Sequence, residues 1–332
     1  MGDLFVTGAI SVLMLLLMAI PGFVLGKMKS VNSEAAVKFL SVMLLYVLQP
    51  FVTFDSFLNT PYDGKVLLNI VAVFVFTCVT IGAVLGIGAL IVRFVPALEP
   101  DSKGVIAYGG AFGNVGYMCR PFLQLMRPGD YVIILYATVS VVAFNLMAWT
   151  LGNYALTHDR RHISLKRALL NPPTLSFIIA LPLFLLNINF TEAASLTGAA
   201  KELVDGIAGV ISFFSDMVGP LAMVLLGLKL SDMSFKQLFT DPRVYISSSI
   251  KLVFYPLLSA ALICLMSLIM NVSEISLNLL ALSAMPCAQN VIMFSTVYDK
   301  DSALAAKEVT VSTLLSIVTI PLILMLLSVL PA

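Results

Sequence analysis

Charged residues are scarce in this sequence. Asp, Glu, Lys and Arg together make up 11% of the 332 residues, against roughly 25% in soluble domains. Apolar residues make up 60% of the chain. A chain with so little charge cannot surround an apolar core with a solvated surface, which argues against a soluble globular fold. The net charge of +1 gives no reason to expect a nucleic acid partner.

The residues of common catalytic and metal sites are few as well. The two histidines, His158 and His162, lie in one loop, and the four cysteines lie far apart in apolar stretches without metal-ligand spacing. No His-Glu-x-x-His or Gly-x-Ser-x-Gly motif occurs, and no Gly-x-x-x-x-Gly-Lys loop is present to bind ATP. We therefore expect no cofactor, no resident metal, no enzymatic activity and no ATP-driven transport.

Long apolar runs are what the sequence has in abundance. A bilayer core about 30 Å thick is crossed by a helix of roughly 20 residues, and runs of that length recur along the whole chain. They predict an all-α polytopic membrane protein with ten spanning helices, at residues 5–26, 36–57, 65–92, 104–127, 131–156, 172–188, 205–229, 243–270, 276–298 and 302–330.

The basic residues alternate between the loops of this ten-helix arrangement. The loops on one side hold 13 of the 19 basic residues: Lys27, Lys29, Lys38, Arg93, Lys103, Arg160, Arg161, Lys166, Arg167, Lys229, Lys236, Arg243 and Lys300. The other side holds Lys65, Arg127 and Lys201. The positive-inside rule places the richer side in the cytoplasm, so both termini are expected outside a bacterial-type inner membrane.

The two halves of the chain resemble each other weakly and in the same order. The matching pairs are Pro21 with Pro182, Pro50 with Pro220, and Asn114 with Asn290. A basic loop at 158–171 separates a first five-helix repeat (1–157) from a second (172–332). Because five is odd, the second repeat enters the membrane from the opposite side, which predicts an inverted repeat of the kind that many secondary transporters share.

Two of the expected spans contain helix breakers in matching positions. Glycine lowers the cost of irregular backbone and proline removes a backbone donor, so both predict interrupted helices at spans 4 and 9. Interrupted helices at membrane depth are tolerated only where they are buried or line a cavity, and such pairs mark transport sites. The residues expected to form the breaks are Gly113, Gly116, Pro121 and Pro286.

Amide side chains next to these breaks are the candidate substrate ligands. Asn114, Gln289 and Asn290 flank the breaks, and Asn145 in span 5 can reach the same place. An amide donates to a carboxylate and accepts from a hydroxyl, and exposed helix N-termini add partial positive charge. The alternative is that these asparagines hold spanning helices together.

Arg120 is the most distinctive charged residue within a span. An Arg at the centre of a spanning helix costs roughly 2.5–3.5 kcal/mol to insert, so a substrate carboxylate is one partner that we expect for it. The alternatives are that Arg120 reaches the outer surface or pairs with Asp55 or Asp216.

Other ionisable residues within the expected spans are weaker candidates. Asp216 and Lys251 are interpreted as coupling or support residues, or as partners of each other. Lys307 and Glu308 lie near the start of span 10 and are expected at the membrane interface, and Asp55 is expected to be half exposed.

Taken together, four stretches resemble the auxin efflux carrier family, in particular its bacterial malate and malonate permease-like branch. They read GNVGYMCRPFL, NPPTLSFIIALPL, FFSDMVGPLAMVLLGLKL and MPCAQNVIMFSTVYDKDSALAAKEVTVSTLLSIVTIPLIL. The resemblance implies ten helices, broken crossover helices 4 and 9, and a homodimer. It also implies a scaffold of helices 1, 2, 6 and 7, with helices 3–5 and 8–10 moving as an elevator.

Two departures bear on the substrate. The plant branch carries an acid and a lysine in its third helix, whereas this chain has neither between Lys65 and Arg93, and the long plant loop is absent. Both argue against auxin. The sequence therefore predicts a secondary transporter of a mono- or dicarboxylate such as malate or malonate, with proton or sodium coupling. A sodium/proton antiporter or sodium-coupled symporter of similar fold is the alternative, followed by a membrane sensor or an enzyme.

Overall fold

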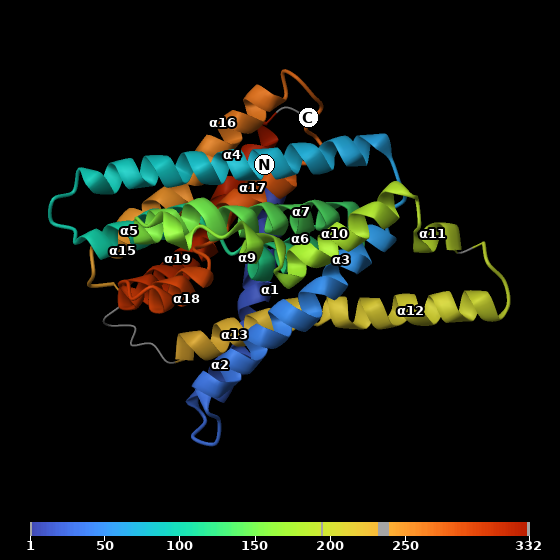
Figure 1. Cartoon of the computed structure of the whole chain (residues 1–332), viewed down its shortest axis with the longest axis horizontal. Helices are drawn as coiled ribbons and strands as arrows, with labels where there is room; N and C mark the ends of the chain where they lie inside the picture. Colours follow the sequence, from blue (N-terminus) through green and yellow to red (C-terminus); the bar gives the residue numbers. More distant parts are fainter. Residues whose placement is uncertain (1, 194, 232–238, 331–332) are drawn as a thin grey trace.

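The computed structural model describes residues 2–193, 195–231 and 239–330, and these residues form an all-helical protein (Figure 1). Within them, the only extended pairing is an isolated antiparallel bridge between Gly113 and Cys287. The helices are α1 (Gly2–Lys27), α2 (Ser33–Val42), α3 (Gln49–Leu58), α4 (Gly64–Arg93), α5 (Pro100–Ala111), α6 (Arg120–Met126), α7 (Tyr131–Met147), α8 (Asn153–Thr157), α9 (Leu165–Leu169), α10 (Pro172–Leu185), α11 (Phe190–Ala193), α12 (Ala199–Asp216), α13 (Val218–Ser231), α15 (Arg243–Ser249), α16 (Tyr255–Met266), α17 (Ser276–Ala284), α18 (Asn290–Val297) and α19 (Ser302–Leu324).

Several helices continue one another through short π-helical turns. The turns are Met43–Leu48 between α2 and α3, Val115–Cys119 before α6, Ala148–Gly152 between α7 and α8, and Ile250–Phe254 between α15 and α16. Such turns often occur inside helices at functional sites.

Seven helical stretches in the described residues are long and apolar enough to cross a membrane. They are Phe5–Lys27, Ser33–Leu58, Gly64–Arg93, Tyr131–Thr157, Ala199–Ser231, Arg243–Met266 and Ser302–Ser328. The segment Arg160–Leu169 and α10, bent by 44° from each other, pass the same test together and bring the number to eight. The expected spans 104–127 and 276–298 differ from these because each consists of shorter helices with irregular residues between them. The count of ten therefore stays a prediction.

Polar residues in the loops set where many of these helices begin. Asp63, Asp130, Asn171 and Asp301 each accept a hydrogen bond from a backbone N–H in the first turn of the helix that follows. Capping of this kind satisfies donors that a helix leaves open at its N-terminus. The short polar loops of an otherwise apolar chain thus fix the ends of the helices.

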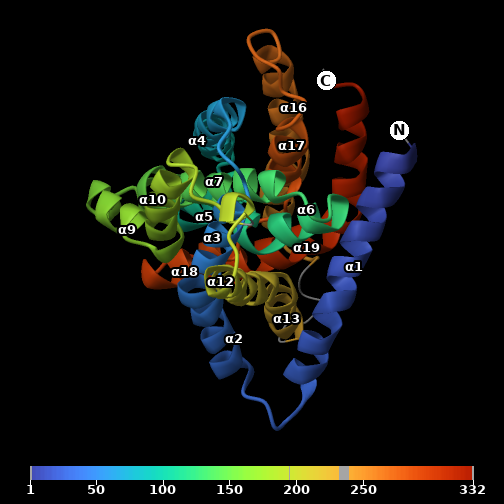
Figure 2. The ribbon, with the colours of Figure 1, turned by 90° about the vertical axis from the view of Figure 1, so that its right-hand side faces the viewer.

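The helices pack in two groups that meet along one boundary. In one group α1 lies on α13, and α3 packs on α10 and α12. In the other, α4 lies on α5 and α7, and α19 packs on α15, α17 and α18. Contacts of α1 with α19 and of α3 with α7 join the groups, and Figure 2 shows α1 along one edge of the molecule.

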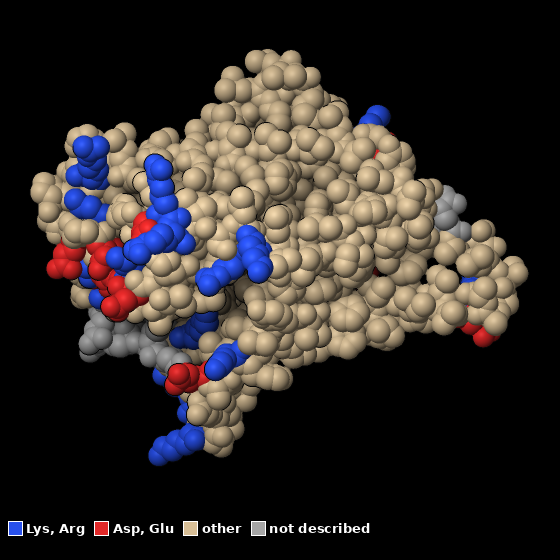
Figure 3. Space-filling model, viewed as in Figure 1, with Lys and Arg blue, Asp and Glu red and all other residues tan. Residues whose placement is uncertain are grey.

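Charge is gathered at one end of the molecule. Figure 3 shows Lys and Arg clustered over the end where α5 and α15 begin, with a broad uncharged band across the middle. Exposed charge that lies towards the ends of long apolar helices is the distribution that a bilayer requires.

Candidate functional site

The irregular segments between α5 and α6 and between α17 and α18 lie against each other. The backbone is extended at Phe112 and at Met285, where α5 and α17 end. The Asn114 N–H donates to the Pro286 carbonyl at 2.7 Å, and the Ala288 N–H donates to the Phe112 carbonyl at 2.9 Å. Each segment thus forms hydrogen bonds with backbone N–H and carbonyl groups that have no partner within the other's interrupted helix, as their burial requires.

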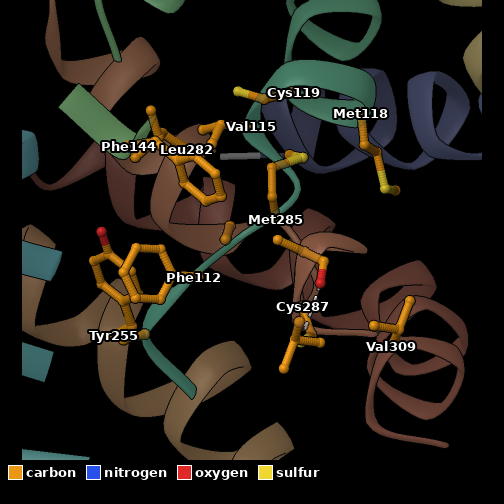
Figure 4. Close-up of a cluster of buried hydrophobic side chains, with 14 of the residues drawn as sticks. Phe112, Val115, Met118, Cys119, Phe144, Tyr255, Leu282, Met285, Cys287 and Val309 are labelled. Carbon is orange, nitrogen blue, oxygen red and sulfur yellow. Dashed lines mark hydrogen bonds between the residues drawn. The ribbon is translucent and has the colours of Figure 1, made fainter. Parts of the chain in front are cut away.

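Apolar side chains surround this pairing. Figure 4 shows Phe112, Met285 and Cys287 with Leu282 and other buried side chains about the two segments, and all four are at most 3% exposed. The predicted glycines make close approach possible there. A Cβ at Gly113 would lie 2.8 Å from Nζ of Lys251, and one at Gly116 would lie 3.3 Å from Nε2 of Gln49. The Gln49 side chain in turn donates to the Gly116 carbonyl at 3.2 Å.

A cavity of about 670 Å³ opens beside the paired segments. Its walls come from the end of α2 and the start of α3, both irregular segments, α7, the loop around α9, the end of α13 and the start of α18. Its lining includes Ser164, Lys166 and Arg167 of the basic loop 158–171, and Lys166 and Arg167 are exposed.

All four amides predicted from the sequence line this cavity. Asn145 Nδ2 lies 3.4 Å from Asn171 Oδ1, and Asn290 Nδ2 donates to the Tyr108 hydroxyl at 2.8 Å. The Asn290 Oδ1 atom has no hydrogen bond partner among the described residues. Asn114 is 5% exposed and Gln289 is 8% exposed, so both side chains are buried at the breaks. Their binding role stays a prediction.

The cavity also contains three basic side chains that sequence reasoning did not assign to the site. Lys229, in the last turn of α13, donates to Oε1 of Gln289 at 2.8 Å. The Arg167 guanidinium lies 5.6 Å from the centre of the Trp149 ring, and Lys166 lines the mouth. Within the described part of the chain, no Asp or Glu lines this cavity. The positive-inside rule already accounts for basic residues in these loops. Their sequence positions therefore gave no separate indication that they line a binding site.

Arg120 lies outside the cavity. It begins α6, is 3% exposed, and donates to the Ser215 carbonyl at 2.8 Å and to the Ser215 hydroxyl at 2.6 Å. That hydroxyl donates to Oδ2 of Asp55 at 2.7 Å. The geometry matches the alternative of pairing towards Asp55, through Ser215. Asp55 itself is 5% exposed, so the expectation of half exposure was wrong.

Asp216 and Lys251 are not brought together. Asp216 is exposed, and its carboxylate accepts a hydrogen bond from Ser212 one turn earlier on α12. Lys251 is fully buried, donates to the Ser283 carbonyl at 2.9 Å and lies 4.0 Å from the centre of the Tyr255 ring. Successive positions on a helix face different directions, so intramembrane position alone could not decide this pairing.

No metal centre emerges from the described parts of the chain. They contain no group of three or more His, Cys, Asp or Glu side chains placed to hold an ion. His162 lies 4.0 Å from the Asp159 carboxylate, and its ring contacts Tyr298.

Comparison with known proteins gives a consistent result over the whole length. A family model described as "Membrane transport protein" matches residues 7–163 and 155–324. An uncharacterized transporter of Methanocaldococcus jannaschii is 22% identical over 315 residues, which cover 94% of this chain and 96% of that protein. An uncharacterized transporter of Methanothermobacter thermautotrophicus is 24% identical over 316 residues, with the same two coverages.

Proposed function

The chain belongs to the membrane transport protein family, to which the auxin efflux carriers also belong, and we propose that it is a secondary transporter of a small organic anion. The observation that carries this proposal is the cavity at the two helix breaks. Its wall combines four amides with Lys166, Arg167 and Lys229, and none of the described residues that line it is an acid. A site with that balance of charge attracts an anion and repels a cation.

The chemistry of the wall favours a carboxylate. The ammonium of Lys229 donates to the neutral oxygen of Gln289, and no acid among the described residues pairs with it. The start of α18 at Asn290 adds the partial positive charge of a helix N-terminus. A carboxylate accepts from amide and ammonium donors together, and about 670 Å³ is ample for a mono- or dicarboxylate of the size of malate or malonate.

We propose that the ten expected spans are built from the helices described. Seven come from the long apolar stretches and one from α9 with α10. The other two are the interrupted pairs, α5 with α6 and α17 with α18, whose breaks cross at Gly113 and Cys287. This count preserves the inverted repeats 1–157 and 172–332 and places both termini outside the cell, with the cavity open to the cytoplasm by the positive-inside rule.

Transport then requires one group of helices to move against the other. We assign the scaffold to α1–α3, α10, α12 and α13, and the moving part to α4–α8 and α15–α19. The hydrogen bonds from Arg120 of α6 to Ser215 of α12 join these two groups outside the cavity lining, and Ser215 donates in turn to Asp55 within the scaffold. They support a cytoplasm-open state that is closed on the far side. The homodimer that the family resemblance implies stays a prediction.

A binding screen followed by uptake tests the proposal. The purified protein is heated with malate, malonate, lactate, citrate and neutral sugars, since a ligand that binds the folded state raises its melting temperature. The ligand that stabilises most is then offered, labelled, to proteoliposomes. We expect a mono- or dicarboxylate to stabilise the protein and to enter the vesicles. Stabilisation by none of the acids, together with no uptake, would overturn the proposal.

Removal of one positive charge from the cavity tests whether Lys229 binds the anion. Lys229→Ala removes a charge-assisted hydrogen bond worth about 1.5–3 kcal/mol, so we expect the Kd for the stabilising acid to rise by about tenfold or more. Lys201→Ala, an exposed lysine at the start of α12 and outside the cavity lining, is the matched control and should bind like the parent. Equal Kd values for the two variants would remove Lys229 from the site.

A further inference from the structure

Glu308 is the most deeply buried acid among the described residues. It lies on α19, two turns after the helix begins, and its exposed fraction is 0%. The expectation that it lies at the membrane interface stays a prediction, but its side chain is covered by neighbouring helices. Gly109 makes room for it, because a Cβ at Gly109 would collide with Oε2 of the Glu308 carboxyl. Burial on this scale is costly for an ionised carboxylate unless it is paired.

No such pairing is present among the described residues. Neither Glu308 carboxyl oxygen has a hydrogen bond partner. The Ser247 hydroxyl is close enough to influence the carboxyl, but it donates to the Val244 carbonyl. Burial without partners raises the free energy of the ionised Glu308 carboxylate, so this carboxyl takes up a proton readily when a second negative charge comes near.

The charged groups around Glu308 are already engaged elsewhere. Arg243 pairs with Asp241 at 2.7 Å and with Asp301 at 3.1 Å, and Lys307 pairs with Asp241 at 3.0 Å. The hydrogen bond from Arg243, with that from Lys307, holds the pKa of the Asp241 carboxyl well below its usual range, so Asp241 stays ionised. None of these groups is free to neutralise a charge on Glu308.

The remaining titratable groups near Glu308 come from the paired segments. The Cys287 thiol lies beside the carboxyl, since both come within 3.3 Å of a Cβ built at Gly109. Figure 4 shows Cys287 near Val309, the residue after Glu308, and the Cys287 N–H donates to Ser312 of the same helix at 3.0 Å. Lys251 lies at the other side of the pairing, against Gly113, with its ammonium donating to the Ser283 carbonyl.

This position couples the carboxyl to the cavity. Cys287 and Glu308 both lie against Gly109, the backbone of Cys287 pairs with Gly113, and Gly113 lines the cavity. A carboxylate at Glu308 would therefore lie behind the paired segments, about one layer of residues from a bound anion. Two like charges about 10 Å apart at an effective dielectric constant near 20 repel enough to weaken binding on the order of tenfold. Protonation of Glu308 removes that repulsion, and by reciprocity the bound anion favours protonation.

On the basis of the proposed function, we propose that Glu308 is the proton-binding site of an anion–proton symporter. A proton from the aqueous phase on the loading side forms an O–H bond with the Glu308 carboxylate as the anion enters. The neutral carboxyl then crosses with the moving helices. The O–H bond breaks, and the proton returns to water on the far side, when the anion leaves. One proton moves with each anion.

Glu308→Gln tests this proposal because the amide imitates the protonated carboxyl permanently. In proteoliposomes, a proton gradient directed inwards should raise uptake by the parent severalfold and leave uptake by Glu308→Gln unchanged. The variant should still exchange internal for external anion when no gradient is applied. Glu34→Gln, an exposed acid at the start of α2, is the matched control and should respond to the gradient like the parent.

A second measurement keeps the proposal open to refutation if the variant does not fold. Calorimetry of anion binding to the parent, in two buffers of different ionisation enthalpy, counts the protons taken up for each anion. One proton for each anion supports the assignment, and none overturns it. If Glu308→Gln keeps the full response to the gradient, Glu308 is not the site. If the parent transports no anion at all, the proposed function fails. That result differs from the two results above, which refute only the role of Glu308.

Discussion

Lys229 and Arg120 are two cationic side chains with different roles. Lys229 lines the cavity, and Arg120 joins α6 to α12. Lys229 ends α13 at the cavity and meets a neutral amide oxygen, so its charge is available to a ligand. Arg120 begins α6, and two of its guanidinium nitrogens are bound by Ser215. The Nε atom of Arg120 has no partner among the described residues, so the contact is not fully satisfied. Such a contact can hold a conformation without making it irreversible.

We predict that Ser215→Ala loosens the closed side. The variant removes the hydroxyl that links Arg120 to Asp55, and a hydrogen bond to a charged group is worth about 1.5–3 kcal/mol, so opening should become about tenfold more frequent. Cys119, which precedes Arg120 and is 0% exposed, reports the opening directly. The rate at which a maleimide modifies Cys119, followed by mass spectrometry, should rise about tenfold.

Ser212→Ala is the control for this experiment. Its hydroxyl bonds only Asp216 in the described structure, so Cys119 should react as slowly as in the parent. Equal Cys119 rates in the parent and in Ser215→Ala would contradict the role given to the Arg120 contact.

The amides of the site could be predicted from the sequence, and the cations could not. Asn114 and Asn290 stand beside glycine and proline residues that break helices, so their place followed from backbone chemistry. Lys229 occurs at a loop boundary that the positive-inside rule explains by itself. The burial of Glu308 could not be predicted, because distance from the end of a helix says nothing about which neighbouring helix covers the side chain.

At the scale of elements, α1 and α13 are held together by glycines. A Cβ at Gly22 would overlap the Val224 carbonyl, and one at Gly227 would overlap the Ala19 carbonyl. Small residues let helices in a membrane approach closely enough for backbone to pack on backbone. This crossing fixes the angle of α13 and so the place of Lys229 at the cavity.

We predict that Gly227→Ala lowers the stability of the protein. The added methyl group has no room beside the Ala19 carbonyl, and overpacking of this kind costs about 1–3 kcal/mol. The melting temperature in detergent, measured by size-exclusion chromatography after heating, should fall by several degrees. Gly206→Ala on α12 is the control, because nothing lies within 4 Å of its built Cβ. A melting temperature equal to that of the control would refute the tight crossing.

Hydropathy predicted the long helices well and the interrupted ones only in part. α4, α7 with α8, and α19 fall where apolar runs of sufficient length required them. The breaks followed from Gly113 and Pro286, but the hydrogen bonds that join them cross more than 170 residues of chain and leave no local pattern. The proton site behind them depends on the same long-range contact.

At the scale of the whole molecule, the positions of the basic residues predict one orientation in the membrane. Basic residues gather at one end, and the cavity lining includes Lys166 and Arg167 of the basic loop. The sequence predicts which end faces the cytoplasm, because that follows from counting Lys and Arg. It cannot predict which side is open, since two packings of the same helices differ in free energy by only a few kcal/mol.

Solute counterflow tests the central claim, that this cavity carries an organic anion, most directly. Proteoliposomes are loaded with the unlabelled carboxylate that stabilises the protein and are diluted into a trace of the same acid, labelled, without any ion gradient. A carrier exchanges the two, so we predict a transient accumulation of label that is strongly reduced in Lys229→Ala and retained in Lys201→Ala. Accumulation that is absent from the parent, or equal in all three proteins, would contradict the account.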